Sequence, residues 1–364
     1  MTTVSDVTER DLIARIQARL PPAPDWMLVG IGDDAAVVEP ERNRVEVLSV
    51  DALVEGVHFD RAFVPAEAIG HRALAVNLSD LAAMGAEPRL ALLSFALPPQ
   101  LPLDDFDGIV VGLTALAARH RVHVAGGNLT RSPGPLMLDV TVAGTVKRRQ
   151  ALTRSGARPG DELYVSGTIG SAAAGLQMLR QHLTTATTVS TEDNEGHGII
   201  RLPRPPSSSV SSVVEPCVER YLRPEPRVRL GLMLARNRVA SACIDLSDGL
   251  ADGVHQIAMA SGVGAAVDVE TLPIDVAARV WFEARGLDPV TESLVAGDDY
   301  ELLFAVRPGA VRRLAAASRH SGAAITRIGR CTKDRAVTMR SAVNGVTLEA
   351  PLPRAGYVHF RQEP

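Results

Sequence analysis

The sequence has few aromatic residues, few cysteines and no long apolar run. Aromatic residues make up 4% of the 364 residues, so Ala, Val, Leu and Ile must build most of the core. The three cysteines, Cys217, Cys243 and Cys331, have no CxxC or CxC spacing, which argues against a disulfide framework or a cysteine zinc site and fits a reducing compartment. No apolar segment approaches the roughly 20 residues of a membrane helix, and the amino terminus does not read as a signal peptide. We therefore expect a cytoplasmic protein without a membrane span.

A strong net charge and the common nucleotide and zinc motifs are also missing. The net charge of −4 and the pI near 6.2 exclude nucleic acid or an anionic membrane as the main partner. The nine histidines form no HExxH or HxxxH pattern, which disfavours a zinc hydrolase. There is no Walker A motif and no kinase glycine loop, so a bound nucleotide needs an unconventional site.

The composition is that of an ordinary folded chain, with 46% hydrophobic and 22% charged residues, and the length predicts two domains. Short β-branched segments predict strands at 45–53, 90–98, 121–127 and 136–146, and Ala-rich segments with helical spacing predict helices at 66–84 and 104–119. The first domain, residues 1–148, is therefore expected to be α/β or α+β, with helices covering one face of a sheet.

A second domain, residues 149–364, is expected after the basic, turn-rich segment 147–161. Two strand–turn–helix patterns follow, ELYVSGTIGSAAAGLQMLRQ and ACIDLSDGLADGVHQIAMASG, and strands are expected at 302–308 and 324–330 with a helix between them. Residues 184–216 are rich in Ser, Thr and Pro without periodicity, which predicts a flexible surface insertion.

Closely spaced carboxylates are the most informative feature of the chain. Residues 244–253 read IDLSDGLADG, with three aspartates and no lysine or arginine, and similar segments are GIGDDAAVV, SVDAL, NLSDLAAMG and AGDDYELLF. Like charges raise one another's pKa unless a cation intervenes, so the pattern predicts a metal. Three of the segments follow an apolar, strand-like run, and acids at strand ends can converge at one rim of a sheet. Magnesium fits such a rim because it prefers oxygen ligands and substrate phosphates.

Each residue also has a structural interpretation. Asp80 and Asp248 each precede a helix-like run and could serve as N-caps. Asp34 could lie in a solvated loop, His58 could be a packed histidine, and Arg154 could be an exposed linker charge. The glycine-rich segments AGGN (125–128) and SGTIG (166–170) could bring backbone amides close to phosphate, although each is a weak signal alone.

Ten segments in the same order resemble the thiamine-monophosphate kinase family: GIGDDAAVV, SVDALVEGVHF, ALAVNLSDLAAMGAEP, AGGN, ALTRSGARPGD, SGTIG, IDLSDGLADG, AGDDYELLF, IGR and GYVHF. The resemblance runs from about residue 28 to 360. It implies a two-domain PurM-like fold that dimerises through the N-terminal sheet, and ATP-dependent phosphorylation of thiamine monophosphate to thiamine diphosphate with several Mg²⁺ ions.

The same resemblance implies roles for individual residues. The implied metal ligands are Asp34, Ser49, Val50, Asp51, Asp80, Asn128, Asp245 and Asp248. The implied ATP contacts are His120, Gly127, Asn128, Arg154 and Ser247. The implied contacts to thiamine monophosphate are His58, Asp298 and Tyr357.

Four positions depart from the family pattern. Val50 stands where Thr is usual, Asn128 where Asp is common, Asp298 where Glu is commoner, and His120 where Tyr is frequent. Two other interpretations therefore stay open. One is another enzyme of the superfamily, of the aminoimidazole ribonucleotide or selenophosphate synthetase type, and the other is a catalytically silent nucleotide-binding dimer.

Overall fold

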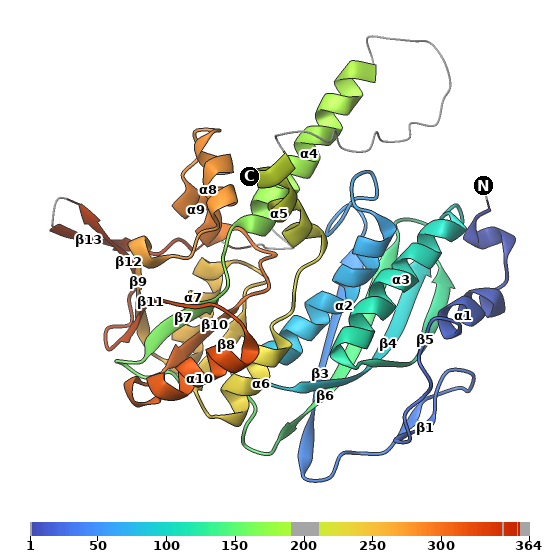
Figure 1. The fold of residues 1–364 in the computed structure, drawn as a ribbon, viewed down its shortest axis with the longest axis horizontal. Helices are drawn as coiled ribbons and strands as arrows, with labels where there is room; N and C mark the ends of the chain where they lie inside the picture. The colour runs from blue at the N-terminus through green and yellow to red at the C-terminus, as the bar shows by residue number, and fades with distance from the viewer. Residues whose placement is uncertain (1, 191–210, 344–345, 355, 357–364) are drawn as a thin grey trace.

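Two mixed β-sheets, one in each half of the chain, organise the fold (Figure 1). The structure is a computed structural model, and it describes residues 2–190, 211–343, 346–354 and 356. Within these ranges no helix combines the length and the apolar character needed to cross a membrane.

The N-terminal sheet has the strand order β3-β6-β4-β5, in which only β4 and β5 run parallel. The predicted strands and the two predicted helices are confirmed. A small hairpin, β1–β2, was not predicted. The elements are α1 (Glu9–Gln17), β1 (Met27–Val29), β2 (Val37–Val38), β3 (Arg44–Val54), α2 (Ala66–Ala83), β4 (Glu87–Leu97), α3 (Leu103–His120), β5 (His123–Arg131) and β6 (Met137–Lys147).

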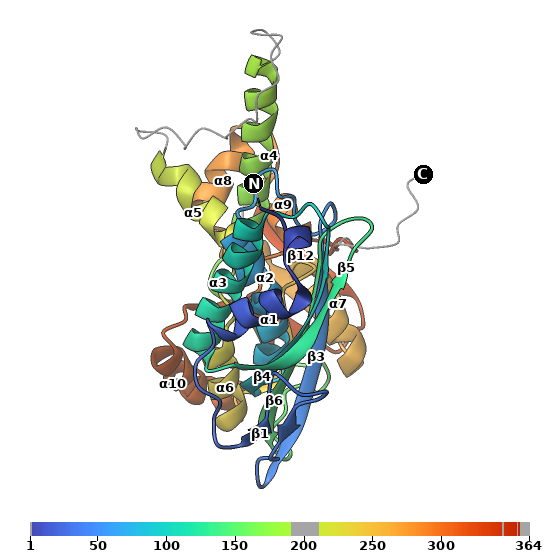
Figure 2. The ribbon, with the colours of Figure 1, turned by 90° about the vertical axis from the view of Figure 1, so that its right-hand side faces the viewer.

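Helices α2 and α3 lie against each other on one face of this sheet (Figures 1 and 2). Glycine permits the close approach, because a Cβ on Gly70 would lie 1.8 Å from the carbonyl oxygen of Ile109. A Cβ on Gly112 would likewise lie 1.8 Å from the carbonyl oxygen of Glu67. The small residues that make these segments Ala- and Gly-rich therefore allow two helices to cover a four-stranded sheet.

The opposite face of the N-terminal sheet presents apolar side chains to solvent. Val50 of β3 is 56% exposed and is in register, through Thr141 of β6, with Leu92 of β4, which is 38% exposed. Leu48 on the same face of β3 is 70% exposed, and Met137 on β6 is 38% exposed. An apolar face of this kind is typical of a protein interface.

The C-terminal sheet has the strand order β13-β12-β9-β11-β7-β10-β8 and is mostly antiparallel. Its predicted strands and helices are confirmed, and α5, α6, β9, α8, α9, β12 and β13 were not predicted. The elements are β7 (Glu162–Ser166), α4 (Ser171–Ser190), α5 (Ser211–Leu222), α6 (Val228–Arg236), β8 (Ala240–Asp245), α7 (Leu250–Ser261), β9 (Gly264–Asp268), α8 (Val276–Glu283), α9 (Pro289–Val295), β10 (Leu302–Val306), α10 (Val311–Ser321), β11 (Ile325–Thr332), β12 (Val337–Val343) and β13 (Val346–Pro351).

Strand β10 joins the two halves of the molecule. Leu302, Phe304 and Val306 point into a core that is continuous with the N-terminal α2 and α3, whereas Leu303 and Ala305 point into a second core beneath α7. A strand buried on both faces reads as an unbroken apolar run, which is the LLFAV of this sequence. The packing holds the end of β8 beside α2.

The predicted insertion at 184–216 is helical at both of its ends. Helix α4 continues to Ser190, and α5 begins at Ser211. Residues 191–210, the middle of the predicted insertion, lie outside the described residues. The Ser- and Thr-rich composition concealed these helical ends. Among the α5 residues whose side chains the structure describes, Cys217 and Tyr221 are buried apolar residues.

Candidate active site

Helix α2 brings predicted metal ligands from strand β3 together with its own. The Ser49 hydroxyl donates to the Asp80 carboxylate, and the Asp51 backbone N–H donates to Asn77 Oδ1 at 2.9 Å. Asn77 and Asp80 lie about one helical turn apart and so face the same strand. Ser49 and Asp51, two residues apart on β3, lie on the face that this helix covers.

The same helix reaches the C-terminal half of the chain. The Ser79 hydroxyl donates to Asp245 Oδ2 at 2.7 Å, and Asp245 is the buried last residue of β8. Asp248 and Ser247 lie in the turn between β8 and α7. Ser79 and Asp80, which are adjacent in α2, therefore bring carboxylates from both halves of the chain to one place. We call Asp51, Asp80, Asp245 and Asp248 the rim carboxylates.

The rim carboxylates repel one another. Burial, and to a smaller extent the charges of Asp80, Asp248 and Asp139, together raise the pKa of Asp51 to about 7. Burial and the charge of Asp80 also raise the pKa of Asp245 to about 7, against the opposing effect of the Ser79 hydrogen bond. Burial raises the pKa of Asp80 as well. Carboxylates in this state favour a proton or a cation.

Arg154 is a cation that acts on this group. Its charge lowers the pKa of both Asp80 and Asp245, although less than burial raises each pKa. Its Nη1 donates to Gln256 Oε1 at 2.5 Å, and its side chain stays exposed. Arg154 is thus more than a linker charge, because it lies close enough to the rim carboxylates to affect their ionisation.

The donor atoms at the rim suit Mg²⁺. They are carboxylate and hydroxyl oxygens, and burial together with the neighbouring carboxylates raises the pKa of Asp51 and Asp245, so an added cation would stabilise their ionised forms. Among the described residues, no group of three or more His, Cys, Asp or Glu side chains is arranged to hold an ion alone. This is compatible with Mg²⁺, which usually takes one or two carboxylates and completes its shell with water and phosphate oxygens.

The local structure around two rim carboxylates differs from the prediction. Asp80 lies in the last turn of α2, and Asp51 lies within β3 rather than after it. The interpretation of Asp80 as a residue that follows a strand, or as an N-cap, is therefore wrong. Only the IDLSD segment has the predicted strand–turn–helix arrangement, with Asp245 at the strand end and Asp248 in the turn.

Three other predicted site residues lie away from β3. Gly127 and Asn128 belong to β5, at the opposite edge of the sheet from β3. Three strand spacings of about 4.8 Å put these two edges about 14 Å apart. Asp34 is exposed in a loop on the β5 side, because Gly30 in the same loop lies against Ala125. Within one chain, these residues are not brought to the rim carboxylates.

His120 and Val50 are also apart from the rim. His120 ends α3, its Nε2 lies 3.9 Å from Glu225 Oε1, and its side chain is only 13% exposed. Little of the ring is therefore available for stacking on a base. The Val50 side chain points to the exposed face of the sheet, opposite to the face that α2 covers.

One predicted substrate contact, Asp298, lies beside the rim. The backbone N–H of Asp298 donates to the Ser247 carbonyl at 2.8 Å, which fixes the AGDDYE segment against the IDLSD turn. His58 lies in a turn after β3. The Val54 backbone N–H donates to His58 Nδ1 at 3.0 Å, and the His58 backbone N–H donates to the Val54 carbonyl at 2.9 Å. Tyr357 lies outside the described residues, but the preceding Gly356 lies against Asp248 and Asp252.

The AGDDYE segment has basic partners that the sequence did not reveal. Glu301 is fully buried and accepts from Arg220, Arg227 and the Ser166 hydroxyl. Asp299 accepts from the Gly170 backbone N–H at 3.0 Å, where α4 begins, and burial raises its pKa to about 8.

The glycine-rich SGTIG turn packs against the carboxylates of the AGDDYE segment. A Cβ on Gly167, at φ +58°, would lie 2.1 Å from Glu301 Oε1. Gly167 is therefore explained by its close approach to Glu301, without a phosphate.

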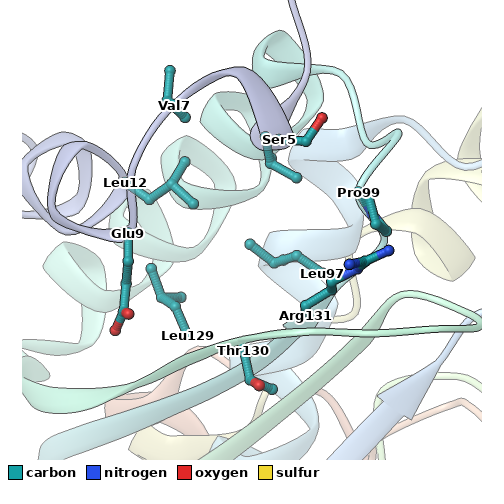
Figure 3. A pocket seen from close by; sticks show the side chains of 10 residues that line it. Ser5, Val7, Glu9, Leu12, Leu97, Pro99, Leu129, Thr130 and Arg131 are labelled. Carbon is teal, nitrogen blue, oxygen red and sulfur yellow. The ribbon is translucent and has the colours of Figure 1, made fainter.

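A hollow near the N-terminus contains none of the predicted site residues. It has a volume of about 350 Å³ and lies between the N-terminal segment and strands β4 and β5 (Figure 3). Apolar side chains such as Leu12, Leu97 and Leu129 make up much of its wall. It lies on the β5 side of the sheet and is separate from the rim carboxylates.

Comparison with protein families supports the arrangement of the two halves. Residues 32–146 match the N-terminal domain of AIR synthase related proteins, and residues 158–341 match their C-terminal domain. The solved thiamine-monophosphate kinase from Stenotrophomonas maltophilia superposes with a TM-score of 0.77 at 38% identity, covering 92% of this chain and 96% of that chain. A second structure, "AaThiL complexed with AMPPCP and TMP", superposes with a TM-score of 0.68 at 28% identity and covers 99% of each chain.

Curated relatives carry the same name. The thiamine-monophosphate kinase of Salmonella typhimurium is 38% identical over 299 residues, which is 82% of each chain. That of Escherichia coli is 36% identical and covers 90% of this chain and 91% of its own. With the PurM-like two-domain fold and the ordered sequence motifs, these matches show that the chain belongs to the thiamine-monophosphate kinase family.

Proposed function

We propose that this protein transfers the γ-phosphoryl group of ATP to thiamine monophosphate, forming thiamine diphosphate and ADP. The observation that carries the proposal is the convergence of Asp51, Asp80 and Asp245 beside Asp298 and Arg154. A relative of this fold has been solved with AMPPCP and TMP together. These groups provide anionic ligands for metal and, next to them, polar groups for two substrates.

The reaction needs little acid–base chemistry from the protein. The acceptor is a phosphate monoester with a second pKa near 6, so its oxygen is already ionised near neutral pH. That oxygen attacks the γ-phosphorus, the bond from this phosphorus to the oxygen bridging it to the β-phosphorus breaks, and ADP leaves with the bonding electrons. We propose direct in-line transfer without a phosphoenzyme, because no serine or histidine is needed as an intermediate acceptor.

The main barrier is repulsion between two anions. At an effective dielectric of about 20, two unit charges 4 Å apart repel by ~4 kcal/mol. Mg²⁺, when bound, supplies the positive charge that offsets this repulsion and the charge on the transferring group. We propose that Asp51, Asp80 and Asp245 hold Mg²⁺ ions, each ion taking one or two of these carboxylates and completing its shell with water and phosphate oxygens, with Ser49 orienting Asp80 and Ser79 orienting Asp245. Asp248 would hold a further ion.

We further propose that the working unit is a homodimer formed through the exposed face of the N-terminal sheet. Such an interface would remove four exposed apolar side chains from solvent: Leu48, Val50, Leu92 and Met137. Asn128 shares this face, because it is in register, through Ser94 and Asp139, with Ala52. A partner across the sheet face can bring its own β5 to this chain's β3. The partner copy would thus supply Asn128, Gly127 and Asp34 to the rim carboxylates.

A direct assay tests the activity. The full-length protein is incubated with ATP, Mg²⁺ and thiamine monophosphate, and both ADP and thiamine diphosphate are measured. We expect the two products in equal amounts, with no exchange between ATP and ADP when thiamine monophosphate is omitted. ADP without thiamine diphosphate would contradict the proposed acceptor, and exchange without acceptor would contradict direct transfer.

Complementation between two impaired variants tests the dimer. Asp80→Asn and Asn128→Ala are each purified, then mixed under conditions that allow subunits to exchange. If Asp80 of one chain acts with Asn128 of its partner, a mixed dimer contains one intact site and activity returns. If both residues act within one chain, no mixed dimer has an intact site and activity stays low.

The proposed location is the cytoplasm. The three cysteines are buried as free thiols, and burial raises the pKa of Cys217 and Cys331 to about 12. Inert, unpaired thiols suit a reducing compartment.

A further inference from the structure

Arg72 of α2 is a buried cation that neither phosphoryl transfer nor metal binding requires. Its side chain is 1% exposed, and its Nη2 lies 3.2 Å from Asp298 Oδ1. Its Nη1 donates to the Tyr221 carbonyl, and its guanidinium carbon lies 4.4 Å from the centre of the Tyr221 ring. Its Nε is buried without a hydrogen-bond partner among the described residues. An incompletely satisfied buried arginine is costly and needs an explanation.

Asp298 is held by this arginine in an uncommon backbone conformation. Asp298 has φ 69° and Tyr300 has φ 48°, both in the left-handed region that favours glycine. The Tyr300 hydroxyl donates to the same Oδ1 at 3.0 Å. Oδ1 is therefore occupied by two donors, and Oδ2 accepts no hydrogen bond from the described part of the chain. The carboxylate side chain is 33% exposed, so it is fixed at one oxygen and accessible from outside.

The second partner of Arg72 leads to the other predicted substrate contact. Tyr221 lies in α5, and its hydroxyl donates to the His58 carbonyl at 3.4 Å. His58 belongs to the N-terminal half of the chain, whereas Asp298 belongs to the C-terminal half. One guanidinium, through Tyr221 on one side and Asp298 on the other, thus connects the two halves beneath the site.

We propose that Arg72, with Tyr300 and Tyr221, is a positioning device that fixes His58 and Asp298 relative to each other for binding of thiamine monophosphate. The inference rests on the proposed function, because it assigns these two residues to that substrate. Arg72 does not touch the substrate and acts through Asp298. Arginine suits this task because its planar fork reaches a carboxylate, a carbonyl and an aromatic face together, which the single ammonium of lysine does not.

The first test removes one hydroxyl. In Tyr300→Phe, the ring stays in place and Asp298 Oδ1 loses one donor. We expect the KM for thiamine monophosphate to rise about 10-fold, the scale of a lost hydrogen bond to a charged group, with the KM for ATP unchanged within about 2-fold. The matched control is Tyr164→Phe, which also removes a hydroxyl bonded to a carboxylate, at Glu162, away from the site. The control should leave both KM values unchanged.

The second test is a double-mutant cycle between Arg72→Lys and Asp298→Asn. Each single variant should weaken equilibrium binding of thiamine monophosphate, measured by calorimetry without ATP. If Arg72 acts through Asp298, Arg72→Lys has little further effect in the Asp298→Asn background. Additive effects would overturn the inference. Equal losses of ATP and thiamine monophosphate binding in Arg72→Lys and Tyr300→Phe would also overturn it, because they indicate a general structural role.

The wild-type protein separates the two claims. If it does not phosphorylate thiamine monophosphate, the proposed function fails. If it does, and Tyr300→Phe behaves like Tyr164→Phe, the proposed function stands and the positioning role fails.

Discussion

The negative charge of two acidic regions, the rim carboxylates and the AGDDYE segment, is offset in different ways. At the rim, Asp80 and Asp245 receive serine hydroxyls, and Arg154 lowers each pKa less than burial raises it. In the AGDDYE segment, by contrast, Glu301 has Arg220 and Arg227, and Asp298 has Arg72. A motif rich in aspartate and glutamate can thus be either a cation site or an internal ion-pair network.

The difference indicates what each region does. A carboxylate already paired with arginine has little need of a metal, and its arginines fix its position. Carboxylates that repel one another have a strong affinity for an added cation. We therefore assign metal binding to the rim and substrate positioning to the AGDDYE segment.

The largest expected effect is on turnover, and it separates the regions most clearly. Asp51→Asn and Asp80→Asn should each lower kcat by at least about 100-fold, the scale of losing one major electrostatic stabiliser of the transition state. The fold should persist, because both changes remove repulsion. Steady-state kinetics and thermal unfolding of the same preparations check both statements. Near-normal turnover in both variants would remove the rim from the mechanism.

The second effect is on stability, and its direction should differ between the regions. Glu301→Gln leaves two arginines without their shared carboxylate, so we expect a loss of roughly 3 kcal/mol in the free energy of unfolding. The matched control is Asp245→Asn, also buried, which should leave the metal-free protein as stable or more stable because it relieves repulsion. Denaturant unfolding without Mg²⁺ measures both. Equal losses in the two variants would show that the rim is also an ion-pair network.

A third prediction concerns pH. Because Asp51 and Asp245 have pKa values near 7 without metal, Mg²⁺ must displace protons below that pH. Below pH 7, each proton that Mg²⁺ displaces should therefore make the Mg²⁺ affinity rise by about 10-fold for every unit that the pH increases. Above pH 7 the affinity should level off. The folding stability of the metal-free protein should change with pH in the opposite direction. A carboxyl pKa raised by folding adds stability at low pH, and this stability is lost as the pH rises from about 4 through about 7. Calorimetric Mg²⁺ titrations at pH 6 and 8 that agree would refute this prediction.

The smallest effect is expected outside both regions. Replacing residues 191–210 by a Gly/Ser sequence of equal length should leave kcat and both KM values within about 2-fold. The helix α5 that holds Tyr221 and Arg220 begins only at Ser211. Deleting the whole of 184–216 should be more harmful, because it removes the start of that helix. A collapse of activity in the first variant would assign a function to residues 191–210.

The sequence predicted which carboxylates come together better than it predicted their surroundings. The acidic segments that contain Asp51, Asp80, Asp245 and Asp248 were expected to converge, and these four residues were named from the family resemblance. They lie together, although Asp80 is helical and does not follow a strand. The metal-ligand roles of Asp34 and Asn128 stay predictions, since these two residues are separated from the rim carboxylates within one chain. No pattern in a single sequence shows which surface faces a second copy.

The arginines of the AGDDYE segment were not predictable. Arg72 precedes Asp298 by more than 200 residues, and Arg220 and Arg227 precede Glu301 by 81 and 74 residues. Their pairing depends on how α2, α5 and the segment before β10 pack in three dimensions. The signal available in the sequence, several acids in a short turn, is the same for both acidic regions.

The most direct test of the metal assignment counts ions bound to the protein. Mn²⁺ is titrated in place of Mg²⁺ into the wild type, Asp80→Asn and Glu301→Gln in the presence of AMPPCP and thiamine monophosphate, and free Mn²⁺ is followed by electron paramagnetic resonance. We predict that Asp80→Asn loses bound Mn²⁺ whereas folded Glu301→Gln binds as the wild type does. Unchanged Mn²⁺ binding in Asp80→Asn would contradict the assignment.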